Sequence, residues 1–138
     1  EEKRENRRRE IELVRADKKE LIAELFAPKG FAPENRKRLR AVIEQLSELI
    51  SMSDSDGVVA VLNGLIQRAD QNEMLLNVPQ LFIFGREDEF IPVAAAEAIV
   101  AAQPQAEIAW LDHSGHMGFV EEPEQALAIL TGFIDRYR

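Results

Sequence analysis

Two short stretches in the C-terminal half hold the side chains best suited to proton transfer. An imidazole can take a proton from a nucleophile and return it to a leaving group, and a carboxylate on its other ring nitrogen fixes the tautomer. Both histidines, His113 and His116, lie in the stretch HSGHMG, and three consecutive acids at 87–89 lie in GREDEF. Residue types alone leave open which histidine would pair with which carboxylate.

Each of these stretches directly follows a predicted strand. The runs QLFIF at 80–84 and EIAWL at 107–111 are short, apolar and rich in strand formers. An Ala-rich helix is predicted over 92–102 and an amphipathic helix over 123–137, so the element order predicts a right-handed crossover and a parallel pair. Ligands bind beyond the carboxyl ends of such strands, where both stretches fall. Because two parallel strands do not form a stable sheet alone, we expect further strands outside this chain.

The first half of the chain is predicted to form a small helical subdomain. Proline and glycine at positions 28, 30 and 33 interrupt the helical pattern. The cluster SMSDSD supplies an N-cap for the last helix, at Ser53 or Asp54. A surface helix is predicted over 3–16, from good helix formers with few apolar positions. Apolar residues at helical spacing predict three more helices, over 18–26, 34–50 and about 54–69.

Composition limits the class of protein. With 138 residues, 46% of them hydrophobic, and no Cys, the chain has enough apolar residues for one packed core and no disulfide scaffold or thiolate metal site. No apolar run approaches the roughly 20 residues of a membrane span, and the charged N-terminus is unlike a signal peptide. We therefore expect a soluble, cytoplasmic protein with no membrane partner. The first residue is Glu, so we expect the sequence to begin inside a longer gene product.

Charge is unevenly distributed, but it does not indicate a nucleic-acid partner. Residues 1–40 carry a net charge of +4 and residues 41–138 a net charge of −12. The basic run Arg7–Arg9 is interleaved with glutamates, and Glu5 with Arg9 forms an i,i+4 pair that cancels most of its field. A solvated helix face is the better interpretation. One plausible imidazole among scattered carboxylates fits no metal-ligand spacing, so no metal and no organic cofactor is implied.

The motifs of the second half resemble those of the α/β-hydrolase family. In that family one strand ends in GxxDxxxP, and the next leads to a loop with GH followed by ExP. The matching positions are Gly85, Asp88 and Pro92, then Gly115, His116, Glu121 and Pro123. The resemblance implies that Asp88 is the catalytic acid and His116 the catalytic base. It also implies an α/β fold with a helical cap over residues 1–77 and the C-terminal part of the hydrolase core over 78–138.

Alternatives to each of these residues are present nearby. His113 is the other candidate for the base, although it lacks a preceding glycine and lies closer to its strand. Glu87 and Glu89 flank Asp88, and the family spacing favours Asp88. Phe26, Phe31 and Met52 would pack between cap helices, with a role in lining a substrate pocket as the alternative.

The family's nucleophile is missing from this sequence. No serine has a glycine two residues before it, so the GxSxG elbow is absent, and the early strands that carry the oxyanion loop are absent too. We therefore expect a C-terminal hydrolase fragment that is inactive alone. The missing N-terminal half would supply a Ser or Asp nucleophile, and the parent protein would cleave an ester, lactone or similar small molecule. The alternative is a non-catalytic helical interaction or assembly module, which predicts a homodimer that swaps strands or domains to cover its sheet edges.

Overall fold

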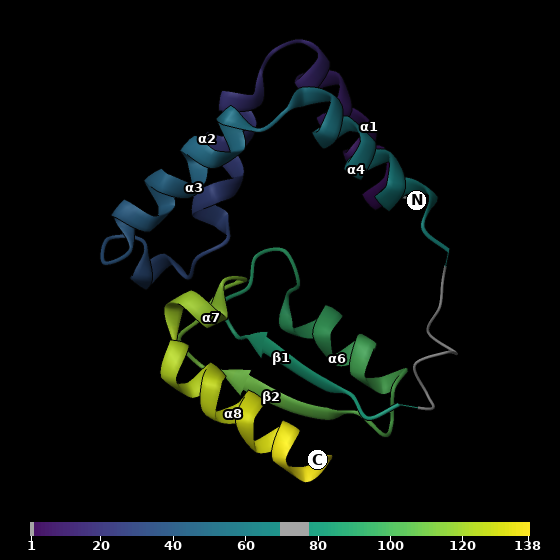
Figure 1. Ribbon diagram of the computed structural model, residues 1–138, viewed down its shortest axis with the longest axis vertical. Coiled ribbons are helices and arrows are strands. Elements are labelled where there is room, and N and C mark those ends of the chain that lie inside the picture. Colours follow the sequence, from purple (N-terminus) through teal and green to yellow (C-terminus); the bar gives the residue numbers. More distant parts are fainter. Residues whose placement is uncertain (1, 70–77) are drawn as a thin grey trace. The chain divides into compact units, whose positions relative to one another are not determined.

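The described residues form two compact units. The computed structural model describes residues 2–69 and 78–138 (Figure 1). The first unit contains the residues up to Ala27 and those from Ala41 to the end of the fourth helix. The second contains Pro28–Arg40 and the described residues from Val78 onward. The stretch Pro28–Arg40, predicted as part of the helical region 1–77, thus belongs to the same unit as the C-terminal residues.

The first unit is built from helices, as predicted. The first and last of them, α1 and α4, pack against each other. Ile11 and Val14 of α1 and Ile43 of α3 are buried. The turn after α1 contains Asp17 with a φ of 57°, a left-handed conformation that asparagine and aspartate tolerate better than most residues. The bounds are α1 Glu2–Arg15, α2 Lys19–Lys29, α3 Arg40–Met52 and α4 Ser55–Gln67.

Two helix boundaries differ from those predicted by more than two residues. The expected helix over 34–50 begins only at Arg40, and Pro33–Asn35 form a single 3₁₀ turn, η1. The reason is tertiary, because the side chain of Asn35 is bonded to His113 and Glu121 of the second unit. Pro28, expected to break the chain, lies inside α2 one residue from its end, where its missing N–H removes only one backbone bond.

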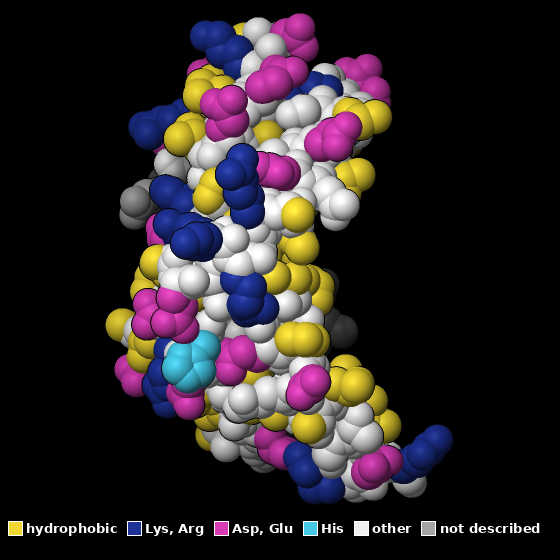
Figure 2. Space-filling model, turned by 90° about the vertical axis from the view of Figure 1, so that its left-hand side faces the viewer, with side chains coloured by type: hydrophobic (Ala, Val, Ile, Leu, Met, Phe, Trp, Pro, Cys, Tyr) yellow, Lys and Arg dark blue, Asp and Glu magenta, His cyan; other side chains and the backbone are white. Residues whose placement is uncertain are grey.

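The basic run near the N-terminus is paired with neighbouring glutamates. Arg7 Nη1 lies 2.8 Å from Glu10 Oε2, and Arg8 Nη1 lies 3.2 Å from Glu5 Oε2. The expected Glu5–Arg9 pair is longer, at 4.0 Å. On the face shown in Figure 2, acidic and basic side chains intermingle over the helical unit. The interpretation as a solvated helix face is consistent with these pairs.

The cap of α4 gives a first testable prediction. Asp54 has an extended backbone, and its Oδ2 accepts a hydrogen bond of 2.7 Å from Gly57 N. Replacing Asp54 by Ala is expected to lower the free energy of unfolding by about 1 kcal/mol, measured by urea denaturation. Ser53→Ala is the control, because the Ser53 hydroxyl bonds Leu49 O of α3 and not the start of α4. A larger loss for Ser53→Ala would contradict the cap assignment.

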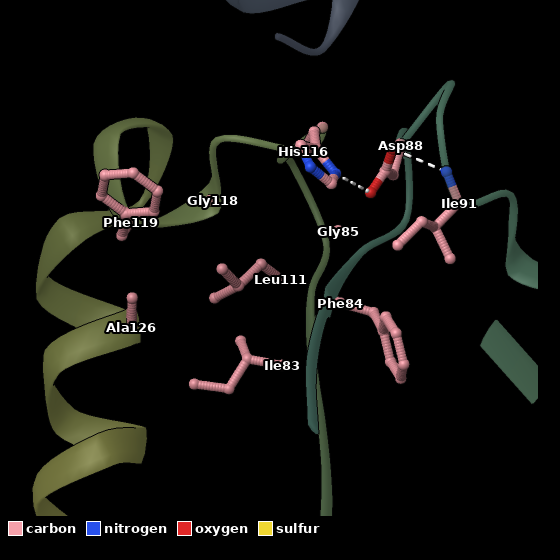
Figure 3. A pocket seen from close by; sticks show the side chains of 11 residues that line it. Ile83, Phe84, Gly85, Asp88, Ile91, Leu111, His116, Gly118, Phe119 and Ala126 are labelled. Atoms are coloured by element: carbon pink, nitrogen blue, oxygen red, sulfur yellow. Dashed lines mark hydrogen bonds and ion pairs between the residues drawn. The ribbon is translucent and has the colours of Figure 1, made fainter. Parts of the chain in front are cut away.

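The second unit contains the predicted strand–helix–strand–helix series. The strands β1 (Leu81–Gly85) and β2 (Glu107–Leu111) pair in parallel, in a register that sets Gly85 opposite Leu111. The helices α6 (Val93–Ala101) and α8 (Pro123–Arg136) lie on opposite sides of the strands (Figures 1 and 3). The parallel pair predicted from the sequence is confirmed. The short helix α7 (Gly118–Glu121) was not predicted.

The core of the second unit includes part of the segment before α3. Leu111 and Phe84 are buried at the ends of the two strands, and Phe31 is fully buried. Phe31 was expected to pack between cap helices, but it lies in Pro28–Arg40 and so belongs to this unit. Met52, for which the same role was expected, is exposed. The segment before α3 is therefore part of the scaffold on which the C-terminal loops rest.

One face of α8 exposes a stripe of apolar side chains. Leu127, Leu130, Ile134 and Tyr137 are all exposed, and their spacing places them on one side of the helix. Within the described residues β1 pairs only with β2, so each strand has one edge without a neighbouring strand. An exposed apolar stripe and open strand edges are each typical of a surface that another part of a fold covers.

Among the described residues, no single helix has both the length and the apolar character needed to cross a membrane. The pair α3 and α4 passes that test only when taken together, and the two helices are bent by 97° at their junction.

Candidate active site

Asp88 is held by the loop that leaves β1. Its side chain is 4% exposed, and its Oδ1 accepts hydrogen bonds from Phe90 N at 2.7 Å and Ile91 N at 2.9 Å. An aspartate bonded to backbone N–H groups two and three residues ahead closes a tight local turn. The turn fixes the carboxylate and leaves Oδ2 to point out of the loop (Figure 3).

His116 meets the second oxygen of this carboxylate. Its Nδ1 lies 2.8 Å from Asp88 Oδ2, although the two residues are 28 positions apart in sequence. Because an ionised carboxylate only accepts hydrogen bonds, Nδ1 carries the proton and Nε2 is the basic nitrogen. The imidazole is 45% exposed. The ring of Phe90 packs against it in an edge-to-face arrangement, with the two ring centroids 5.3 Å apart. An oriented and partly exposed imidazole is the arrangement that a general base requires.

Backbone bonds hold the two loops side by side. Arg86 N donates to Leu111 O at 3.0 Å, and Glu87 N donates to Ser114 O at 2.9 Å, so the parallel ladder continues past the strand ends. Gly85 makes this approach possible, because a Cβ there would lie 2.1 Å from Gly115 O. The glycine and the ladder together bring the loop of Asp88 beside the loop of His116.

The alternative residues lie elsewhere. His113 is 73% exposed, and its Nδ1 lies 3.1 Å from Glu34 Oε1, so it does not meet Asp88. Glu87 is exposed, and Glu89 forms an ion pair with Arg36. Of the candidates named from the sequence, the structure brings together Asp88 and His116. Their catalytic roles stay a prediction.

Some residues that support the site were not predicted from the sequence. Glu121 was noted only as part of a motif, and Asn35 was not singled out. Both are buried, and Asn35 Nδ2 donates to His113 O at 2.6 Å and to Glu121 Oε2 at 2.9 Å. For Glu121 the available signal was its place in the ExP motif, and for Asn35 it was the interruption of helical patterning by proline and glycine just before it.

A cavity of about 230 Å³ adjoins the pair. Apart from Asp88 and His116 its lining is apolar, and Figure 3 shows Ile83 and Leu111 pointing from the strands toward α8. A pocket with apolar walls and a few convergent polar groups is typical of a small-molecule site. The lining residues are Ile83, Phe84, Gly85, Asp88, Ile91, Leu111, Gly115, His116, Gly118, Phe119 and Ala126. Within residues 2–69 and 78–138, no three or more His, Asp or Glu side chains are grouped so as to hold a metal ion.

The chain is similar in sequence to several esterases. It is 23% identical over 132 residues to a Haemophilus influenzae protein named as an esterase/lipase, covering 86% of this chain and 46% of that protein. It is 30% identical over 104 residues to the pimeloyl-[acyl-carrier protein] methyl ester esterase of Xanthomonas campestris pv. campestris, covering 72% of this chain and 39% of that enzyme. The chain thus spans less than half the length of these relatives. No family model matches the sequence.

Solved structures extend the similarity to almost the whole chain. The fold matches a malate-bound thermophilic esterase from Thermogutta terrifontis with a TM-score of 0.87 and 28% identity, over 98% of this chain and 50% of that one. The enol-lactonase of Burkholderia xenovorans shares the fold with a TM-score of 0.78 at 20% identity, over 91% of this chain and 48% of that one. With curated relatives and solved structures in agreement, the chain belongs to the α/β-hydrolase family.

Proposed function

We propose that the complete protein hydrolyses an ester, lactone or similar small molecule, and that this chain supplies the base, His116, and the acid that orients it, Asp88. The observation that carries the proposal is the 2.8 Å bond from His116 Nδ1 to a buried carboxylate whose other oxygen is held by two backbone N–H groups. The esterases among the relatives support an ester substrate. The apolar cavity beside the pair supports a small organic one.

The reaction follows from the tautomer that Asp88 imposes. When the nucleophile is a serine hydroxyl, its oxygen bonds to the ester carbonyl carbon while His116 Nε2 takes its proton. The tetrahedral intermediate then breaks the ester C–O bond, and Nε2 returns the proton to the departing alcohol. A water molecule then attacks the acyl carbon while Nε2 takes its proton. The bond from the acyl carbon to the serine oxygen breaks as Nε2 returns the proton to that oxygen, which releases the carboxylic acid and restores the serine. In both steps Asp88 stabilises the imidazolium without taking its proton.

We also propose that the nucleophile and the oxyanion donors lie in an N-terminal segment outside this chain. The matched structures are about twice as long as the chain, which covers 50% of the Thermogutta terrifontis esterase. The apolar stripe of α8 and the unpaired edges of β1 and β2 give that segment a surface to cover. On this proposal residues 1–77 contain the cap, and the chain alone is inactive.

The test compares three samples on p-nitrophenyl butyrate, followed by nitrophenolate absorbance. The protein expressed from the complete gene is expected to hydrolyse the ester, and the 138-residue chain alone is expected not to. Adding the separately expressed N-terminal segment to the chain is expected to restore turnover. Turnover by the chain alone would contradict the placement of the nucleophile. Absence of turnover on an ester and lactone panel by the complete protein would favour an interaction module instead.

A further inference from the structure

Glu121 is a buried carboxylate that the proposed reaction does not use. The residue is 3% exposed, and three N–H groups donate to it. Gly115 N donates to Oε1 at 2.7 Å, while Ala32 N and Asn35 Nδ2 donate to Oε2 at 2.7 and 2.9 Å. Burying a charge is costly unless the charged group is hydrogen-bonded, and these three donors offset that cost. Glu121 therefore has a defined structural role.

These bonds join the loop of His116 to a distant stretch of chain. We call residues 30–35 the bracket and residues 113–117 the histidine loop. Besides the Glu121 bonds, Met117 N donates to Gly30 O at 2.9 Å, and Asn35 Nδ2 donates to His113 O at 2.6 Å. The bracket therefore holds the histidine loop on both sides of His116. The two backbones are in close contact, since a Cβ on Gly115 would lie 2.8 Å from Ala32 N.

The imidazole depends on this support. Within the part of the chain that the structure describes, the hydrogen bond of the His116 ring goes to Asp88, and that carboxylate is fixed independently by its own turn. The distance between the two side chains is therefore determined by where the histidine loop lies. Glu121 bonds the residue directly before His116, and through Oε2 it ties that residue to the bracket.

We propose that Glu121 is a positioning residue for His116, acting together with Asn35 of the bracket. The pair holds the histidine loop so that the imidazole stays within hydrogen-bond distance of Asp88. The inference rests on the proposed function, because it assigns a role in that same reaction. It adds to that function a second carboxylate, which sets the geometry of the base without touching substrate.

A change from Glu121 to Gln tests one bond of this arrangement. Every partner of the carboxylate is an N–H donor, so the amide NH₂ group of Gln must face a donor. The amide oxygen keeps two bonds if it takes the place of Oε2, which leaves the NH₂ group against Gly115 N. The substitution therefore replaces a hydrogen bond at Gly115, the residue before His116, by a contact between two donors, which displaces the histidine loop. The side-chain volume stays nearly the same.

The experiment uses the protein expressed from its complete gene. Glu121→Gln is expected to lower kcat for p-nitrophenyl butyrate about 10- to 100-fold, because a small misplacement of a catalytic group has that effect, and to change KM less than about twofold. Asn35→Ala, which removes the donor to both His113 O and Glu121, is expected to act in the same direction. Glu124→Gln is the control, since Glu124 is exposed three residues further along. The double variant Glu121→Gln/Asn35→Ala is expected to lose less than the product of the two single effects.

A second readout does not depend on activity. The proton on His116 Nδ1, bonded to Asp88, is expected to give a downfield resonance in a sample labelled with ¹⁵N-histidine. Glu121→Gln and Asn35→Ala should broaden or shift this resonance, and Glu124→Gln should not. If the complete protein hydrolyses no ester, the proposed function fails, and the resonance still decides whether Glu121 positions His116.

Two results would overturn the inference. One is an unchanged resonance and unchanged kcat in Glu121→Gln. The other is a loss of stability, measured by urea denaturation, with the resonance and the ratio of kcat to KM intact, which would show a structural role only. Should Glu121→Gln fail to fold, Asn35→Ala decides by the same two readouts.

Discussion

Replacing Asp88 by Asn is expected to lower kcat for ester hydrolysis about 10⁴-fold in the complete protein while the fold stays intact. The reason lies in the bonds of the two carboxylate oxygens. Oδ1 accepts from Phe90 N and Ile91 N, so the amide oxygen of Asn must take that position. The amide NH₂ group then faces Nδ1 of His116 and donates to it. That forces the proton onto Nε2, the nitrogen that must accept the nucleophile's proton.

The measurement compares kcat and KM on p-nitrophenyl butyrate across matched variants. Glu87→Gln makes the same chemical change one residue earlier, on an exposed side chain, and is expected to retain wild-type kcat. His116→Ala is expected to lose at least about 10³-fold, and His113→Ala to stay near wild type. KM should change little in Asp88→Asn, since the substitution alters proton transfer and not the apolar cavity.

The same set of variants separates the alternatives. A large loss in Glu87→Gln with activity retained in Asp88→Asn would place the acid elsewhere in the loop. A large loss in His113→Ala with activity retained in His116→Ala would reassign the base. If circular dichroism showed that Asp88→Asn loses folded structure to the same extent as activity, the effect would come from the Asp88 turn and not from the tautomer.

Gly85→Ala is expected to destabilise the protein by about 3 kcal/mol or more. A Cβ at this position would lie 2.1 Å from Gly115 O and 2.3 Å from Ser114 O, and both are backbone atoms that cannot rotate away. Relief of the clash requires the loops after β1 and β2 to separate. Separation breaks the bond from Glu87 N to Ser114 O and moves Asp88 away from His116. Activity should therefore fall together with stability.

Gly132→Ala is the matched control for Gly85→Ala. Gly132 lies in α8 of the same unit, and a Cβ there would meet only Arg136 Nη1, at an ordinary 3.7 Å. Because alanine is a better helix former than glycine, the free energy of unfolding is expected to rise by about 0.5–1 kcal/mol. Urea denaturation of both variants gives the comparison. A loss below about 1 kcal/mol for Gly85→Ala would show that the loops can move apart freely.

Local patterns determined most of the secondary structure. The apolar run at β2 was predicted with the bounds that the structure shows, and β1 lies one residue later than predicted. The N-cap of α4 was predicted at Ser53 or Asp54, and the structure has it at Asp54. The proline at the start of α8 was also predicted, because capping and proline effects act within one helical turn. The parallel pairing of β1 and β2 followed from the element order alone, through the handedness of crossovers.

The stretch before α3 shows where local patterns fail. Its helical spacing predicted a helix from residue 34, yet the structure has a 3₁₀ turn at Pro33–Asn35 and a helix only from Arg40. Asn35 and Ala32 donate to Glu121 instead, 86 and 89 positions along the chain. Helical spacing reports only neighbours within a few residues, so it carries no signal of such partners.

By itself, the sequence determined the strands, their parallel order and the loops that carry Asp88 and His116, because strand propensity, crossover handedness and motif spacing are local or topological properties. The family spacing favoured Asp88 and His116, and the tertiary structure brings these two to 2.8 Å while His113 lies elsewhere. Tertiary structure alone revealed that Glu121 and Asn35 hold the histidine loop. Those contacts depend on how closely backbones approach at Gly85 and Gly115, and on buried charges finding donors from distant segments. Neither quantity is encoded in the spacing of residues along the chain.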